Sequence, residues 1–135
     1  MRKPLYARAD AGLRMVARKT VPLSPTAAGV AIDASGRVEV RARGQEQHLE
    51  VGMDAAVPDG TTFLVFANGL PAGTITIASG AGDFYINNNE QVLPIGVDPV
   101  CDMGTVEIRD GNNGVLLRGA VTGPQGTLHS AVFPD

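Results

Sequence analysis

Two neighbouring segments in which apolar and polar residues alternate one by one are the feature that most constrains this fold. The apolar positions are Val38, Val40 and Ala42 in residues 37–43, and Leu49, Val51 and Met53 in residues 48–53. A period of two places alternate side chains on opposite faces of a strand. The polar residues Gly44-Gln45-Glu46-Gln47 between the segments are typical of a turn. The sequence therefore predicts an antiparallel hairpin with one apolar face.

Most of the remaining chain follows the same pattern in short segments. Further strands are predicted over residues 12–18, 61–67, 74–77, 83–86, 105–109, 115–121 and 128–133, with one short strand near Val92. Seventeen glycines and nine prolines separate these segments, as turn residues do. Residues 5–18 also fit a helix, but the alternation of Leu13, Met15 and Ala17 with charged residues favours an extended segment. The pair Asn68-Gly69 predicts a tight turn, lengthened by residues 70–73.

The number and shortness of these strands predict the fold class. We expect an all-β protein, an antiparallel two-sheet β-sandwich of about seven to nine short strands with an extended N-terminal arm. The expected organisation is an extended basic arm over residues 1–23 and a single β-sandwich domain over residues 24–135. A chain of 135 residues can bury a core without a disulfide or a metal. Residues 36–41 resemble residues 104–109, which indicates either an internal duplication or a shared sheet pattern.

The net charge of the first nineteen residues is opposite in sign to that of the rest. They hold six of the eleven basic residues and one of the fourteen acids, whereas the rest holds five basic residues and thirteen acids. This contrast predicts that the arm docks on an acidic body, its own or that of another copy. Because a surface ion pair contributes only about 0–1 kcal/mol, burial of apolar arm residues would supply most of the energy. These residues are Leu13, Met15, Val16, Val21 and Leu23.

The favoured function is a non-enzymatic structural subunit that self-assembles into a filament or another homopolymer. In this hypothesis the arm pairs with the sheet edge of a neighbouring copy, since strand addition forms many main-chain hydrogen bonds at once. In the alternative, the arm is the first strand of its own sandwich. A viral capsid or decoration protein is a further hypothesis, which differs by a closed symmetric assembly.

Residues 87–104 support a different hypothesis, an extracellular binding or adhesion module. This segment is predicted to be a long loop, and loops at the ends of sandwiches often carry recognition. The polar contacts to a glycan, peptide or protein ligand would come from Tyr85, Asn87, Asn88, Asn89 and Gln91. An aromatic content of 4% without tryptophan counts against a stacking surface for carbohydrate or single-stranded nucleic acid.

Three segments carry a resemblance to known sequences. They are Thr61–Gly69 with its Val-Phe-Ala-Asn-Gly core, the adjoining Leu-Pro-Ala-Gly-Thr of residues 70–74, and the Val-Leu-Leu-Arg-Gly of residues 115–119. Over roughly residues 36–121 the chain resembles uncharacterised bacterial β-sandwich proteins that are often predicted to be exported. The resemblance implies a β-sandwich fold and an extracellular setting. It implies no catalytic residues.

No arrangement of residues predicts catalysis, so the chain is not expected to be an enzyme. His48 and His129 lie in predicted strands, and Ser79 lacks the first glycine of a nucleophile elbow. Glu39 and Glu50 could form a glycosidase-like carboxylate pair, but the arginines on the same face favour cross-strand charge pairing. Residues 110–114 are expected to form a turn and not a calcium loop. We therefore assign no catalytic, cofactor-binding or metal-ligating residue, and expect no cofactor.

The composition bears on the partners and the location of the protein. Cys101 is the single cysteine and is expected to be a buried small hydrophobe. A net charge of −3 makes a nucleic-acid partner unexpected. No stretch reaches the ~18 apolar residues of a membrane span. Charged residues interrupt the N-terminal segment, which is not an intact signal peptide. The expected location is cytoplasmic, or extracellular or cell-surface if a signal peptide has been removed.

Overall fold

The computed structural model describes residues 14–95, 97, 103–121 and 127–133, and the side chains of residues 18–95, 97 and 103–121. The described part consists mostly of strands, with one short helix. In chain order its elements are β1 (Arg14–Pro25), α1 (Ala27–Ala31), β2 (Ser35–Arg43), β3 (Glu46–Asp54), β4 (Thr62–Ala67), β5 (Leu70–Thr76), β6 (Ala81–Asn87), β7 (Thr105–Arg109), β8 (Val115–Ala120) and β9 (Thr127–Phe133). The predicted all-β class is confirmed.

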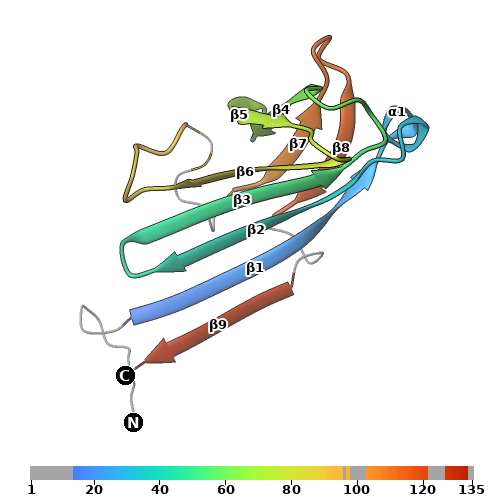
Figure 1. The fold of residues 1–135 in the computed structure, drawn as a ribbon. Coiled ribbons are helices and arrows are strands. Elements are labelled where there is room, and N and C mark those ends of the chain that lie inside the picture. The colour runs from blue at the N-terminus through green and yellow to red at the C-terminus, as the bar shows by residue number, and fades with distance from the viewer. Residues whose placement is uncertain (1–13, 96, 98–102, 122–126, 134–135) are drawn as a thin grey trace.

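All strand pairs in the described residues are antiparallel and belong to one continuous sheet. The strand order is β5-β4-β7-β8-β1-β2-β3-β6, and β9 pairs with β1 outside this path. The sheet curls until β5 and β6 approach each other, as Figure 1 shows. There the Phe84 ring lies so close to Gly73 that a Cβ at residue 73 would be 2.2 Å from it. The result is a nearly closed, barrel-like sheet.

The two separate sheets expected for a sandwich are not confirmed, because β1 belongs to both halves. One edge of β1 pairs with β2 from Val16 to Leu23. Its other edge pairs first with β9, over Arg14 to Thr20, and then with β8, at Ser24 and Pro25. Ser24 faces Arg118, whereas Thr20, four residues earlier, faces Thr127, nine residues later. Between these two pairs the chain advances four residues along β1 but nine residues from β8 to β9, a difference of five residues.

The core lies inside the curled sheet and is made of the apolar positions that alternate along the strands. Val38 and Val40 of β2 and Leu49 and Val51 of β3 are fully buried, as the predicted hairpin requires. Other strands add Phe63, Val65, Ala67, Ile75, Val106, Ile108 and Leu117. The segment after β6 adds Leu93, Val97 and Met103. This segment therefore packs part of its length against the core.

The turn between β4 and β5 is tighter than the sequence predicts. Asn68 and Gly69 both have positive φ, of 54° and 79°, which the predicted two-residue hairpin turn requires. Ala67 pairs directly with Leu70, so residues 70–73 belong to β5 and do not lengthen the turn. Among the described strands β5 pairs with β4 alone, and such an edge strand accommodates Pro71, which has no amide hydrogen to donate to a second neighbour.

Two local predictions fail. The short strand expected near Val92 is irregular chain, and this side chain is 91% exposed. The helix α1 was not expected, because five residues are too few to show an apolar stripe. Thr26 caps its first turn by accepting a hydrogen bond from the Gly29 amide.

Residues 14–23 of the expected arm form most of β1, which continues past the expected boundary to Pro25. They pair with β2 of the same chain. This part of the arm is therefore the first strand of the chain's own sheet, as in the alternative hypothesis, and is not free to pair with a neighbouring copy. Residues 1–13 lie outside the described residues.

Candidate functional site

The outer face of β2, β3 and β6 presents the polar residues that alternate with the core. Across the three strands Arg37, Gly52 and Asp83 face one another in a single row. The rows on either side are Ser35, Asp54 and Ala81, and Glu39, Glu50 and Tyr85. Gly52 therefore lies at the centre of these three rows, among mostly polar residues, and has no side chain of its own.

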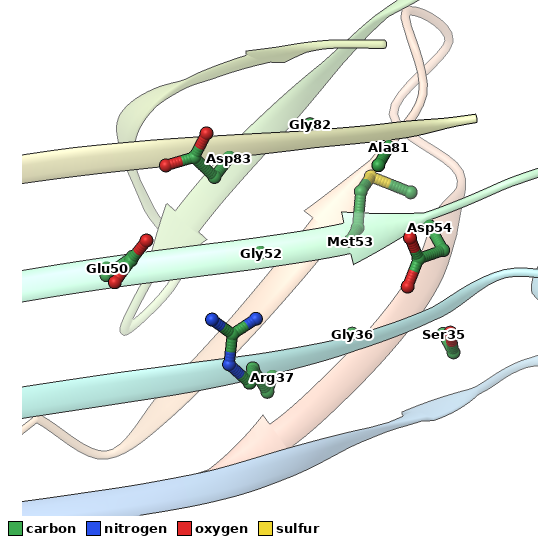
Figure 2. A pocket seen from close by; sticks show the side chains of 10 residues that line it. All are labelled: Ser35, Gly36, Arg37, Glu50, Gly52, Met53, Asp54, Ala81, Gly82 and Asp83. Atoms are coloured by element: carbon green, nitrogen blue, oxygen red, sulfur yellow. The ribbon is translucent and has the colours of Figure 1, made fainter. Parts of the chain in front are cut away.

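Gly52 lines a surface hollow of about 620 Å³, which we call the outer hollow. Its lining consists of Ser35, Gly36, Arg37, Glu50, Gly52, Met53, Asp54, Ala81, Gly82 and Asp83. Figure 2 shows Arg37, Glu50, Asp54 and Asp83 projecting around Gly52 from three adjacent strands. The volume lies within the range of sites for small molecules, about 300–1,000 Å³.

Arg37 extends over Gly52. A Cβ at residue 52 would lie 2.7 Å from Nη1 of Arg37, so the guanidinium occupies this position only because residue 52 is glycine and would have to shift for a larger residue. Within the described part of the chain, no carboxylate lies within 4.0 Å of this guanidinium and no hydrogen bond to it is formed. Its donors are therefore available in a hollow that also contains Glu50, Asp54 and Asp83.

Glu39, on the same face, is engaged in ion pairs. Its Oε2 lies 2.7 Å from Nε of Arg18 and 3.8 Å from Nε of Arg41. Glu39 and Glu50 face each other across β2 and β3, but only Glu39 has arginine partners among the described residues. This arrangement supports the expected cross-strand charge pairing.

Glu107 of β7 forms a matching ion-pair cluster elsewhere on the sheet. Arg109 and Arg118 approach its carboxylate to 2.6 and 3.0 Å. Burial raises the pKa of the Glu107 carboxyl, but hydrogen bonds and charge from the two arginines outweigh that effect and hold this pKa below its ordinary value. Arg109 also stacks on the Phe66 ring, 3.9 Å from its centroid. This carboxylate is thus a structural ion-pair acceptor.

Three of the predicted binding residues, Tyr85, Asn87 and Asn88, form hydrogen bonds within the protein. The Tyr85 hydroxyl shares a 2.5 Å hydrogen bond with Nδ1 of His48. Asn87 is 4% exposed, and its side-chain oxygen accepts hydrogen bonds from the amides of Asn89 and Glu90. Asn88 donates to the Gln45 carbonyl and accepts from the Gln47 amide. Asn87 also donates to the Tyr85 hydroxyl at 3.5 Å, so these two side chains lie together, whereas Asn88 joins the loop to the β2–β3 hairpin.

Of the five predicted binding residues only Asn87 is buried, and Tyr85, Asn88, Asn89 and Gln91 are exposed at the surface. Val92 and Ile95 nearby are 91% and 83% exposed, while Leu93 between them is buried. The loop thus presents the polar residues 88–91 and the apolar Val92 and Ile95 to solvent, and Leu93 packs against the core.

The predicted arm residues have different positions. Val21 and Leu23 are buried, with exposed fractions of 1% and 5%. Met15 and Val16 lie in β1, opposite Val132 and Ala131 of β9. Leu13 lies outside the described residues. Docking of the residues before β1 on a neighbour therefore stays a prediction.

The remaining polar candidates are turn or strand residues. Ser79 has a φ of 53°, and its amide donates to Oδ1 of Asp59. The Asp110 carboxylate accepts hydrogen bonds from the amides of Asn112 and Gly114, which confirms the predicted turn. His129 lies in β9, and Cys101 is outside the described residues. Among the residues that the structure describes, no three His, Cys, Asp or Glu side chains are grouped as a metal site requires.

The outer hollow was not predicted from the sequence, although one residue, Gly52, indicated it. Gly52 occupies a polar position in an otherwise regular alternation of apolar and polar residues, and a glycine there marks a close approach by another group. The pairing of β3 with β6 supplies the other half of the hollow, and residue spacing does not give that pairing.

Comparison of the chain with protein-family models and with curated proteins finds no match. In the described part of the chain, no helix has the length and apolar character needed to cross a membrane.

Proposed function

We propose that this protein is a non-enzymatic structural subunit that assembles with copies of itself through the outer edge of β9. The observation that supports the proposal is a strand paired along one edge only. β9 pairs with β1 over seven residue pairs, and no other strand of the described residues pairs with it. Figure 1 shows β9 beside β1, at the side of the sheet away from β2.

The sequence of β9 favours further pairing. Its residues Thr-Leu-His-Ser-Ala-Val-Phe contain no Asp, Glu, Lys, Arg, Pro or Gly. Proteins that avoid edge-to-edge association place charges, prolines or bulges on exposed edge strands. β5 has such features, with Pro71, Gly73 and a register shift opposite Val65 and Phe66. β9 has none of these protections.

The symmetry of the assembly depends on what pairs with β9. Antiparallel pairing of β9 with β9 of a second copy uses the same surface twice and gives a closed dimer. Pairing of β9 with the basic residues 1–13 of the next copy uses two different surfaces and gives a ring or a filament. The second arrangement preserves the arm-docking hypothesis for the part of the arm that precedes β1.

Proline substitutions at two adjacent positions test the proposal. Successive amide hydrogens of a strand point to opposite edges, so of Ser130→Pro and Ala131→Pro one removes a donor to β1 and the other removes an outward donor. We expect one variant to lose thermal stability. The other should keep its melting temperature and lose assembly, measured by light scattering and negative-stain electron microscopy.

Two results would contradict this function. The first is a wild-type chain that stays monomeric near 14 kDa at all concentrations. The second is a folded outward-facing proline variant that assembles like the wild type. Filaments, rings or closed shells in the micrographs would distinguish a filament subunit from a capsid or decoration protein.

A binding or adhesion module is the second candidate, favoured by the exposed loop residues Asn89, Gln91, Val92 and Ile95. Such a module can work as a monomer, whereas a filament subunit cannot. A monomeric wild type that loses a ligand when Asn89 and Gln91 are both changed to alanine would support this candidate over assembly.

A further inference from the structure

We propose that the outer hollow binds a small molecule that carries both a carboxylate and amino groups, of the size and charge of a free basic amino acid. The site is separate from β9, so this inference does not depend on assembly. It rests on the guanidinium of Arg37 over Gly52 and on the three carboxylates around them.

The first argument is the state of Arg37. A guanidinium has five donors in a planar fork that matches a carboxylate. On the same face Arg18 and Arg41 approach Glu39, and on β7 and β8 Arg109 and Arg118 approach Glu107. Arg37 makes no such contact within the described residues, although Glu50, Asp54 and Asp83 line the same hollow. Its fork is therefore free to receive a carboxylate from a ligand.

The second argument is the charge of the lining. Arg37 contributes one positive charge, and Glu50, Asp54 and Asp83 contribute three negative charges. A simple anion would bind Arg37 against three nearby carboxylates, and a simple cation would leave Arg37 without a partner and repel it. A molecule with one carboxylate and two ammonium groups meets both requirements, since its carboxylate pairs with Arg37 and its ammonium groups pair with the acids.

The third argument concerns other ligand classes. The ten lining residues include no aromatic side chain, so the hollow offers no ring on which a sugar or a base can stack. A bare metal ion is disfavoured because the described residues contain no metal-type grouping of three ligands. The lining supplies mostly charged and backbone groups, which suit a small, strongly polar zwitterion.

Three related probes test this assignment by calorimetric titration of the full chain. L-lysine carries all the required groups, cadaverine lacks the carboxylate, and norleucine lacks the side-chain amine. We expect saturable binding of L-lysine, and affinities at least about 10-fold lower for the other two, since each loses a charge-assisted hydrogen bond. No binding of L-lysine, or equal binding of cadaverine, would overturn the proposal. Equal binding of cadaverine would mean that only the acidic side chains of the hollow attract the ligand and that Arg37 does not take part.

Two variants and one control locate the site. Arg37→Gln should weaken L-lysine at least about 10-fold, and Gly52→Ala should weaken it by displacing the guanidinium with a Cβ. Arg43→Gln is the control, because Arg43 lies on the same strand but outside the lining. Circular dichroism verifies that each variant is folded. Folded Arg37→Gln and Gly52→Ala proteins that bind L-lysine as tightly as the control would contradict the assignment.

Discussion

At the scale of single residues, two glutamates on different strands each form ion pairs with two arginines. Glu39 and Glu107 occupy corresponding positions in the two similar segments, and each pairs with the arginine two residues later and with an arginine from a neighbouring strand. Both partners of Glu39 are about half exposed, as is Arg118, whereas Arg109 is 18% exposed. Because water screens exposed pairs, we expect the Glu107 cluster to contribute more to stability.

Changing Glu107→Gln should lower the free energy of unfolding by about 1–2 kcal/mol at neutral pH. The folded-state pKa of Glu107 lies below the ordinary value of 4.5. The stability that it contributes is therefore fully present above that value and is lost as the pH falls through the folded-state pKa. Chemical denaturation at pH 7 and at pH values below 4.5 measures both effects. Glu39→Gln is the matched control and should cost less, and a larger cost for Glu39 would contradict the argument.

At the scale of elements, hydrogen bonds from Thr26, the residue that caps α1, to backbone carbonyls hold this helix against β8. The Thr26 amide donates to the Leu116 carbonyl, and the Thr26 hydroxyl donates to the Val115 carbonyl. A Cβ at Gly29 would lie 2.2 Å from the Leu116 oxygen. The close packing of this short helix therefore requires glycine.

Gly29→Ala should lower the free energy of unfolding by about 1–3 kcal/mol, because the backbone of β8 cannot move aside as a flexible side chain would. Gly111→Ala is the control for the same chemical change, since a Cβ there meets no atom within 4 Å. Urea denaturation of both variants gives the comparison. Equal stability of the two variants would show that α1 shifts without cost.

The segment after β6 also acts as an element, since its Leu93 reaches the core. Leu93→Ala should cost about 2–5 kcal/mol, whereas the neighbouring Val92→Ala should change stability by less than about 0.5 kcal/mol. Thermal unfolding of the two variants compares a side chain that is 7% exposed with one that is 91% exposed. Similar melting temperatures would mean that the segment does not cover the core in solution.

At the scale of the whole molecule, β1 connects the two halves of the sheet. It pairs with β2 on one edge and with β8 and β9 on the other. A deletion of residues 1–23 removes most of this strand, and we expect that variant to be unfolded by circular dichroism. A deletion of residues 1–13 keeps every described strand and should fold. If that folded variant still assembles, residues 1–13 are not the docking segment.

Strand positions were largely predictable because each strand has one apolar face, which a period of two reveals. Val38, Val40, Leu49 and Val51 are buried as this pattern requires. The curled single sheet was not predictable, because it depends on which strands pair. The role of β1 arises from pairing with β8, nearly a hundred residues later. The outer hollow depends likewise on the alignment of Gly52 with both Arg37 and Asp83.

The pairing of β9 with a single neighbouring strand affects the exchange of its backbone hydrogens with solvent. Among the strands that the structure describes, β9 pairs with β1 alone and not with β8. Segments with fewer contacts open at a lower free energy than the core strands. We expect amide hydrogens of residues 127–133 to exchange for deuterium before those of β2 in dilute protein, and to become protected as concentration rises. Mass spectrometry of the exchanged protein would therefore follow assembly at the strand proposed to carry it.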